Sequence, residues 1–291
     1  MGGPVRRNMG DGRFHLQHGP IDLIVHADGD ARAVELAHER CWARFQNVLQ
    51  EIVDDLPLLK AEILPDASTC PDDLCSPVSR RMWLSCSKHR ATGRLTAMAA
   101  VAGSVADEMI EFFKADSIQR AWVNNGGDIA LHLSGDAQYR VGLVADIATA
   151  RVPHQTGPVD MCFHLSASGR IRGLATSGWR GRSFSLGIAD SVTVFSADAA
   201  AADAAATVIA NAVDLDDAPP GLIRRLPANE LADNSDLGER QVTVEVNALS
   251  GHQKDRALEA GARCARRVWA AGLIEGVAIC LQGRFWKYGL I

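Results

Sequence analysis

Apolar residues recur every three or four positions between residues 30 and 52, a spacing that predicts an amphipathic helix. The recurring positions are Val34, Ala37, Cys41, Phe45, Val48 and Ile52. Asp30 precedes them as a side chain suited to cap the helix, and Pro57 follows as a residue that stops it. A helix over residues 30–52 with one buried face is therefore expected.

A second helix is predicted from Thr96 to Phe113, and the first half of this segment consists of small side chains. The run from Ala97 to Ser104 reads AMAAVAGS, so a neighbouring group can approach its backbone closely. Close packing of this helix against a sheet is the favoured interpretation. The alternative is that the small residues let a ligand or a metal ion reach the backbone.

Alternating apolar and polar residues predict a hairpin after the second helix. Its strands cover 120–124 and 129–133, and Asn125-Gly126-Gly127-Asp128 forms the turn. Further strands are expected at 139–145, 161–167, 171–175, 191–196, 242–246 and 277–281. Ser168-Gly169 would join the second and third of these. Helices are expected at 198–213 and 254–273, whereas residues 60–95 are expected to form a long connection with one short helix. Because helices and strands do not alternate regularly, the pattern predicts an α+β fold with a mostly antiparallel sheet packed with helices.

The composition is that of a globular chain, since 47% of its 291 residues are hydrophobic and 22% are charged. This length predicts a single domain over residues 1–291, or two interleaved lobes with a ligand site between them. A net charge of −5 gives no basic field for nucleic acid. No apolar run reaches the roughly 20 residues that cross a membrane, and the N-terminal sequence lacks the apolar core of a signal peptide. A cytoplasmic location is expected, with monomer and homo-oligomer as open alternatives.

Cysteine and histidine do not predict a zinc site of a familiar type. The seven cysteines are scattered without a CxxC pair, and the nine histidines show neither HxH nor HExxH. Cys70 and Cys75 flank a turn, but a reducing cytoplasm favours free thiols.

Asp203 and Thr207 lie four residues apart in the predicted alanine-rich helix, so their oxygens face the same side one turn apart. Such a pair could share a hard divalent cation, Mg²⁺ or Ca²⁺. An isolated pair at this spacing is more often structural, with Asp203 at the surface and Thr207 facing the core.

Two glycine-containing loops carry groups that suit a phosphorylated, ring-bearing ligand. The loop Asn125–Asp128 would offer backbone N–H groups to a phosphate or a ring, with Asp128 binding a hydroxyl or a cation; otherwise it is a plain turn. The loop Thr176–Ser183 gathers hydroxyls, glycines and two arginines around Trp179. Arginine binds phosphate oxygens bidentately and tryptophan stacks on planar heterocycles. The residues of this loop that are candidates for binding such a ligand are Thr176, Ser177, Gly178 and Arg180. A Rossmann-type site is not predicted, because the strand, GxGxxG and helix do not occur in order.

The order of these segments resembles a known family. MAAVAG at 98–103, NNGGDI at 124–129, LATSG at 174–178, and SVTV at 191–194 before an alanine-rich helix with DxxxT are similar to the ApbE-like superfamily of FAD-dependent flavin transferases. The likeness spans Thr96 to Ala212. With SDLG at 235–238, it looks most like the branch called uncharacterised protein family 0280. It implies an ApbE-like, T-fold-like architecture.

The resemblance also implies roles for individual residues. Asp203 and Thr207 would be magnesium ligands, together with a backbone carbonyl near Ala99. The residues Asn125, Gly126, Gly127 and Asp128 would line a site for FAD or FMN.

Two departures from the family pattern bear on activity. Flavin transferases have Lys-Gly where this chain has Ala102-Gly103, and a His-x-x-Asp-Pro-x-x-Gly loop where it has Ser183–Gly187. Because that loop is associated with transfer, binding is the firmer expectation. The expected function is binding of a flavin-type dinucleotide with a divalent cation, extended to cleavage or transfer at the pyrophosphate if the protein is an enzyme. The alternative is a non-catalytic flavin- or pterin-binding or assembly protein.

Overall fold

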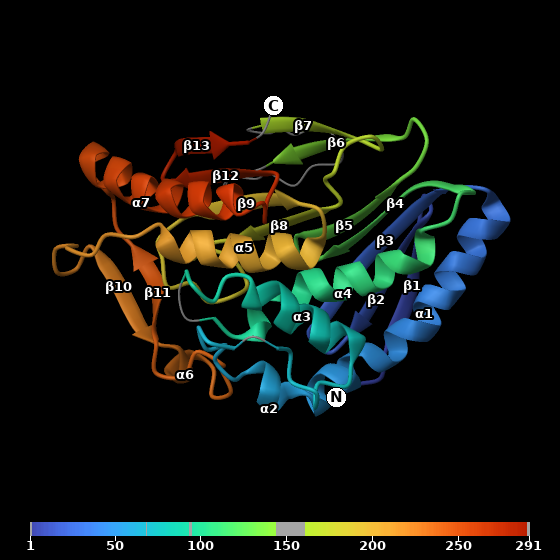
Figure 1. Cartoon of the computed structure of the whole chain (residues 1–291), viewed down its shortest axis with the longest axis horizontal. Helices are drawn as coiled ribbons and strands as arrows, with labels where there is room; N and C mark the ends of the chain where they lie inside the picture. The colour runs from blue at the N-terminus through green and yellow to red at the C-terminus, as the bar shows by residue number, and fades with distance from the viewer. Residues whose placement is uncertain (1, 68, 93–94, 144–160, 290–291) are drawn as a thin grey trace.

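The computed structural model describes residues 2–67, 69–92, 95–143 and 161–289, and its centre is a nine-stranded antiparallel sheet (Figure 1). In spatial order the strands are β1 (Val5–Gly10), β2 (Arg13–His18), β3 (Ile21–Gly29), β4 (Ile118–Asn125), β5 (Asp128–Leu133), β8 (Gly173–Ser177), β9 (Ser191–Ser196), β12 (Gly276–Leu281) and β13 (Arg284–Tyr288). Each neighbouring pair is antiparallel. The expected α+β class with a mostly antiparallel sheet is confirmed.

Helices cover one face of this sheet (Figure 1). The helices that contact the sheet are α1 (Ala31–Asp54), α4 (Val101–Ile110), α5 (Ala199–Ala212) and α7 (Gly251–Ala270). The others are α2 (Leu56–Leu59) and α3 (Pro77–Ser87), which pack on other helices, and α6 (Ala228–Leu231), which packs on β10. The alanine-rich α5 packs on β8 and β9, and α4 packs on β4 and β5. Small side chains let these two helices lie close to the sheet and to each other. No helix of the described residues is long and apolar enough to cross a membrane.

A two-stranded ribbon, β6 (Gln138–Leu143) with β7 (Met161–Ser166), covers the part of the opposite face formed by β5, β8, β9 and β12. Leu131, Leu174 and Phe195 point to this side and form a cluster with Leu165 of β7. Their neighbours along the strands, such as Ala175, point to the helices. The interior strand β9 is therefore buried along its whole length, as expected for a strand covered on both faces. A second ribbon pairs β10 (Ile223–Pro227) with β11 (Gln241–Val246).

Several predicted elements are confirmed. Helix α1 begins after Asp30, whose side chain accepts a hydrogen bond from the N–H of Ala33. The hairpin β4–β5 turns at the predicted glycines, and β9 has the predicted bounds. The segment 97–113 is helical, but it consists of α4 between two short 3₁₀ helices.

Other predictions need correction. Strands β1, β2 and β3 were not anticipated, and neither were β10 and β13. β7 and β8 do not pair through Ser168-Gly169, because β7 pairs with β6 while β8 pairs with β5 and β9. The expected strand 139–145 ends at Leu143, and its last two positions lie outside the described residues. Pro57 lies inside the short helix α2, where proline is tolerated in the first turn.

Candidate functional site

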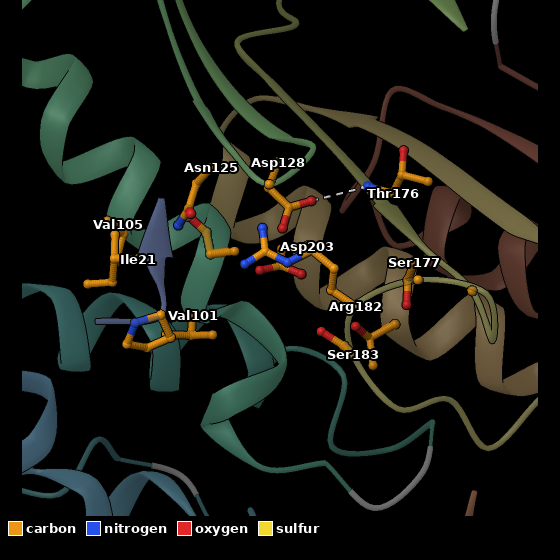
Figure 2. A pocket seen from close by; sticks show the side chains of 16 residues that line it. Ile21, Val101, Val105, Asn125, Asp128, Thr176, Ser177, Arg182, Ser183 and Asp203 are labelled. Atoms are coloured by element: carbon orange, nitrogen blue, oxygen red, sulfur yellow. Dashed lines mark hydrogen bonds between the residues drawn. The ribbon is translucent and has the colours of Figure 1, made fainter. Parts of the chain in front are cut away.

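The three segments singled out in the sequence meet at one cavity of about 280 Å³ (Figure 2). Helix α4 supplies one wall, the β4–β5 turn a second, and the end of β8 with the following loop and α5 a third. The lining residues are Pro20, Ile21, Val101, Ala102, Val105, Asn125, Gly126, Asp128, Thr176, Ser177, Gly178, Gly181, Arg182, Ser183, Asp203 and Thr207. Pro20 and Ile21, at the β2–β3 turn, were missed from the sequence. The alternation of Ile21, Leu23, Val25 and Ala27, all buried, was the signal for β3.

Asp203 reaches the cavity from α5 and also binds the start of α4. Its Oδ2 accepts a hydrogen bond of 3.0 Å from the N–H of Gly103. Thr207, one turn further along α5, lines the same cavity. The two helices approach this closely because residue 103 has no side chain. A Cβ there would lie 2.3 Å from the carbonyl oxygen of Ala199.

A second carboxylate completes a reciprocal arrangement between the two helices. Asp107 of α4 accepts hydrogen bonds from the N–H groups of Ala199 (3.0 Å) and Ala200 (2.8 Å) at the start of α5. Asp203 of α5 in turn accepts a hydrogen bond from the N–H of Gly103, in the first turn of α4. Each helix therefore satisfies N-terminal amides of the other, which a helix cannot satisfy internally. This reciprocal capping fixes Asp203 relative to the cavity.

The β4–β5 turn is held on both sides. Asn125 donates from Nδ2 to the carbonyl oxygen of Ala102 (3.1 Å), and Asp128 accepts from the N–H of Thr176 (3.2 Å). Gly126 and Gly127 have φ angles of +66° and +119°, which favour glycine. The N–H of Gly127 donates to Oδ1 of Asn124 (2.8 Å), so it already has an acceptor. Gly127 is not among the residues that line the cavity.

Two carboxylates dominate the electrostatics of the cavity. Burial raises the pKa of Asp128, an effect that the N–H of Thr176 and the charge of Arg182 oppose. Burial also raises the pKa of Asp203, and the charge of Asp128 raises it further. The two groups therefore disfavour each other's ionised form, and a positive charge placed between them would relieve this repulsion.

The loop after β8 brings one of its two arginines to the cavity. Figure 2 shows the side chain of Arg182 reaching in toward Asp128 and Asp203. Arg180 instead lies outside the lining, with Nε 3.3 Å from Oδ1 of Asp190 and its guanidinium over the ring of Trp179. The indole of Trp179 also donates to Asp190 and packs against the core.

The oxygen donors of the cavity fit a hard divalent cation. Asp128, Asp203 and Thr207 all line it, and carboxylate and hydroxyl oxygens are suitable ligands for Mg²⁺ or Ca²⁺. Ala99 lies just outside the lining, in the 3₁₀ helix before α4, whereas Ala102 belongs to it. No group of three or more His, Cys, Asp or Glu that could hold a metal ion occurs within the described ranges. A cation here would need further oxygens from its ligand.

Comparison with known proteins gives consistent relatives. A family model described as "AbpE bacteria" matches residues 6–286. The UPF0280 protein of Methanothrix thermoacetophila is 33% identical over 169 residues, covering 58% of this chain and 65% of that protein. The UPF0280 protein of Methanococcoides burtonii is 31% identical over 202 residues, covering 69% of this chain and 77% of that protein. The match to the Archaeoglobus fulgidus UPF0280 protein, 37% identical, spans 43% of that relative.

The similar solved structures have lower sequence identity. The Thermotoga maritima ApbE protein has a TM-score of 0.45 at 13% identity, covering 73% of this chain and 87% of that one. The apo form of the Pseudomonas stutzeri flavinyl transferase ApbE has a TM-score of 0.45 at 15% identity, covering 99% and 95%. The family match extends over nearly the whole chain, and the relatives confirm the resemblance noted in the sequence. The chain belongs to the AbpE bacteria family, on the ApbE-like branch that includes the UPF0280 proteins.

Proposed function

We propose that this protein binds a flavin-type dinucleotide together with a divalent cation in the cavity between α4, α5 and the β4–β5 turn. The observation that carries the proposal is the pair Asp128 and Asp203, two carboxylates with raised pKa values that line one cavity. A bound cation would relieve the repulsion between the two carboxylates. Mg²⁺ is commonly shared between carboxylates and substrate phosphates. A pyrophosphate would supply the oxygens that the described residues lack.

The rest of the lining suits the other parts of such a ligand. Pro20, Ile21, Val101 and Val105 form an apolar wall that a planar ring could contact. Ser177 and Ser183 line the cavity as well, whereas the hydroxyl of Thr176 is paired with that of Thr193 on β9 (2.9 Å). The cavity volume lies near the lower end of the roughly 300–1,000 Å³ usual for small-molecule sites. It therefore fits part of a dinucleotide, with the remainder outside.

A non-catalytic role is the second candidate, and one observation favours it. No histidine is among the described residues that line the cavity, and His164 is exposed on β7. Transfer of a phosphoryl group to a hydroxyl usually needs a positioned base. Flavin or pterin binding, with slow hydrolysis at most, agrees with this lining.

The proposal is tested by thermal unfolding with Mg²⁺ alone, FAD alone and both together. We expect the melting temperature to rise strongly only with both, because cation and pyrophosphate complete each other's coordination. Asp203→Asn should lose this combined response. Asp107→Asn is the matched control, since Asp107 also caps a neighbouring helix but does not line the cavity.

The control separates loss of binding from loss of fold. Both variants should melt at lower temperature, but Asp107→Asn should keep the combined response. An Asp203→Asn variant that responds as strongly as wild type would show that the cation is bound elsewhere. A wild-type protein that is unaffected by every combination would refute the proposed ligand class.

A further inference from the structure

Arg182 is the one cationic side chain among the described residues that line the cavity, and it has no partner there. It forms no hydrogen bond and no ion pair with any residue that the structure describes. Its charge nevertheless acts on Asp128, whose pKa it lowers. An extended guanidinium that faces a cavity and has no partner retains all five of its N–H donors for a ligand.

The β4–β5 turn provides the space that this arginine occupies. A Cβ on Gly126 would lie 2.6 Å from Nη1 and 3.4 Å from Cζ of Arg182, so a side chain at this position would displace the guanidinium from its place over the turn. Gly127 has nothing within 4 Å of its Cβ position. Both glycines serve the turn through their positive φ angles, but only the Cβ position of Gly126 meets Arg182.

Arg180, two residues away, belongs to a different set of contacts. It pairs with Asp190 and lies over Trp179, while Asp190 also accepts hydrogen bonds from Trp179 and from the backbone N–H of Gln282. These contacts join the loop to the end of β12.

We propose that Arg182 is the anion-recognising side chain of this cavity, taking phosphate oxygens, and that Arg180 is a structural residue of the same loop. The proposal deepens the proposed function, on which it rests for the class of ligand. Arginine suits this task because its planar fork matches phosphate oxygens bidentately. The contacts of Arg180 and Arg182 differ, although the sequence WRGR gives no reason to distinguish the two residues.

The position of Arg182 beside two carboxylates gives opposite effects on cation and anion. Alone in the cavity, a divalent cation is repelled by the guanidinium and attracted by Asp128 and Asp203. With a pyrophosphate present, the guanidinium and the cation both contact the anion and no longer oppose each other. Removing the charge of Arg182 should therefore strengthen binding of the cation alone and weaken binding of cation and pyrophosphate together.

Isothermal titration calorimetry with Mg²⁺ alone, and then with inorganic pyrophosphate at saturating Mg²⁺, tests this sign reversal. For Arg182→Gln we expect a several-fold lower dissociation constant for Mg²⁺ and a roughly tenfold higher one for pyrophosphate. Arg182→Lys should fall between Arg182→Gln and wild type. Arg180→Gln should leave both constants within about twofold of wild type once folding is verified by circular dichroism.

A pair of glycine variants tests the same contact from the other side. Gly126→Ala displaces the guanidinium and should weaken pyrophosphate binding as Arg182→Gln does. Gly127→Ala strains the turn at a φ of +119° but leaves Arg182 untouched, so it should preserve pyrophosphate binding in the folded fraction.

The outcomes distinguish this inference from the proposed function. If wild type binds pyrophosphate with Mg²⁺ and Arg182→Gln binds it equally well, Arg182 is not the anion ligand and the inference fails alone. Equal losses for Arg180→Gln and Arg182→Gln would also overturn it. If wild type binds neither FAD nor pyrophosphate, the proposed function itself fails.

Discussion

Asp107 shows how burial can raise the pKa of a carboxyl group between α4 and α5. It is 6% exposed, and burial raises its pKa to about 7, with the charge of Asp198 adding to the effect. The N–H groups of Ala199 and Ala200 and the charge of Arg81 act in the opposite direction. The folded protein therefore holds this proton at pH values where the unfolded chain, titrating near 3.8, has lost it.

Stability should consequently fall as the pH rises from about 4 to about 7, and this contribution should level off above pH 7. The native state binds the extra proton in this window, so raising the pH removes stability, by at most about 1.4 kcal/mol per pH unit. Urea unfolding of wild type and Asp107→Asn between pH 4.5 and 8 measures it. The variant lacks the titration, so its deficit relative to wild type should shrink as the pH rises. Parallel pH profiles for the two proteins would contradict this assignment.

The contact between α4 and α5 depends on a single glycine, and its effect can be measured by substitution. Alanine normally stabilises a helix relative to glycine by about 0.5–1 kcal/mol. At position 103 the new Cβ would lie 2.3 Å from the carbonyl oxygen of Ala199 and 2.9 Å from the N–H nitrogen of Ala200. We expect Gly103→Ala to destabilise the protein by roughly 1–3 kcal/mol, because the helices must separate.

Gly251→Ala is the matched control for this helix contact. Gly251 begins α7, and its Cβ would approach a side-chain nitrogen of Arg284, which can move. This variant should be neutral or slightly stabilising in chemical denaturation. A Gly103→Ala protein that gains stability as Gly251→Ala does would show that α4 and α5 tolerate a wider spacing.

Elements with a regular spacing of apolar residues were predictable from the sequence. Elements that depend on pairing with strands far away in the sequence were not. The stripe ending at Ile52 defined α1, and the glycine turn defined β4–β5. β1 has a burial pattern that is almost wholly exposed, so its sequence carries no alternation to read. Strand β7 pairs with β6 rather than with β8, and this choice depends on tertiary contacts, because the local sequence pattern does not determine which strands pair.

The candidate site followed the same division. The three segments were recognised from residue types, and they line one cavity. The sequence could not separate Arg180 from Arg182, because two arginines separated by one glycine differ only in what they contact. Nor could it show that Asn124 already accepts a hydrogen bond from Gly127.

For the molecule as a whole, we predict that FAD is bound but that FMN is not efficiently transferred to a protein threonine. The cavity brings together carboxylates, hydroxyls and one guanidinium, and its described lining lacks a histidine to accept the proton of an acceptor hydroxyl. Incubation with FAD, Mg²⁺ and a threonine-bearing flavinylation peptide, followed by AMP release and peptide mass, measures both outcomes.

We expect slow AMP release at most, abolished in Asp203→Asn, and an unchanged peptide mass. Rapid appearance of a flavinylated peptide would overturn this prediction and assign transferase activity to the chain.

The open sheet has one further consequence at this scale, set by its two outer strands. Among the residues that the structure describes, no strand pairs with the outer edge of β1 or of β13. Arg7 on β1 and Lys287 on β13 are both exposed, and charged side chains on edge strands oppose pairing between copies. Both outer strands therefore carry exposed positive charge, which opposes the pairing of either one with an outer strand of another copy. Edge-to-edge association of copies through this sheet, either into a symmetric dimer or into an extended filament, is therefore disfavoured.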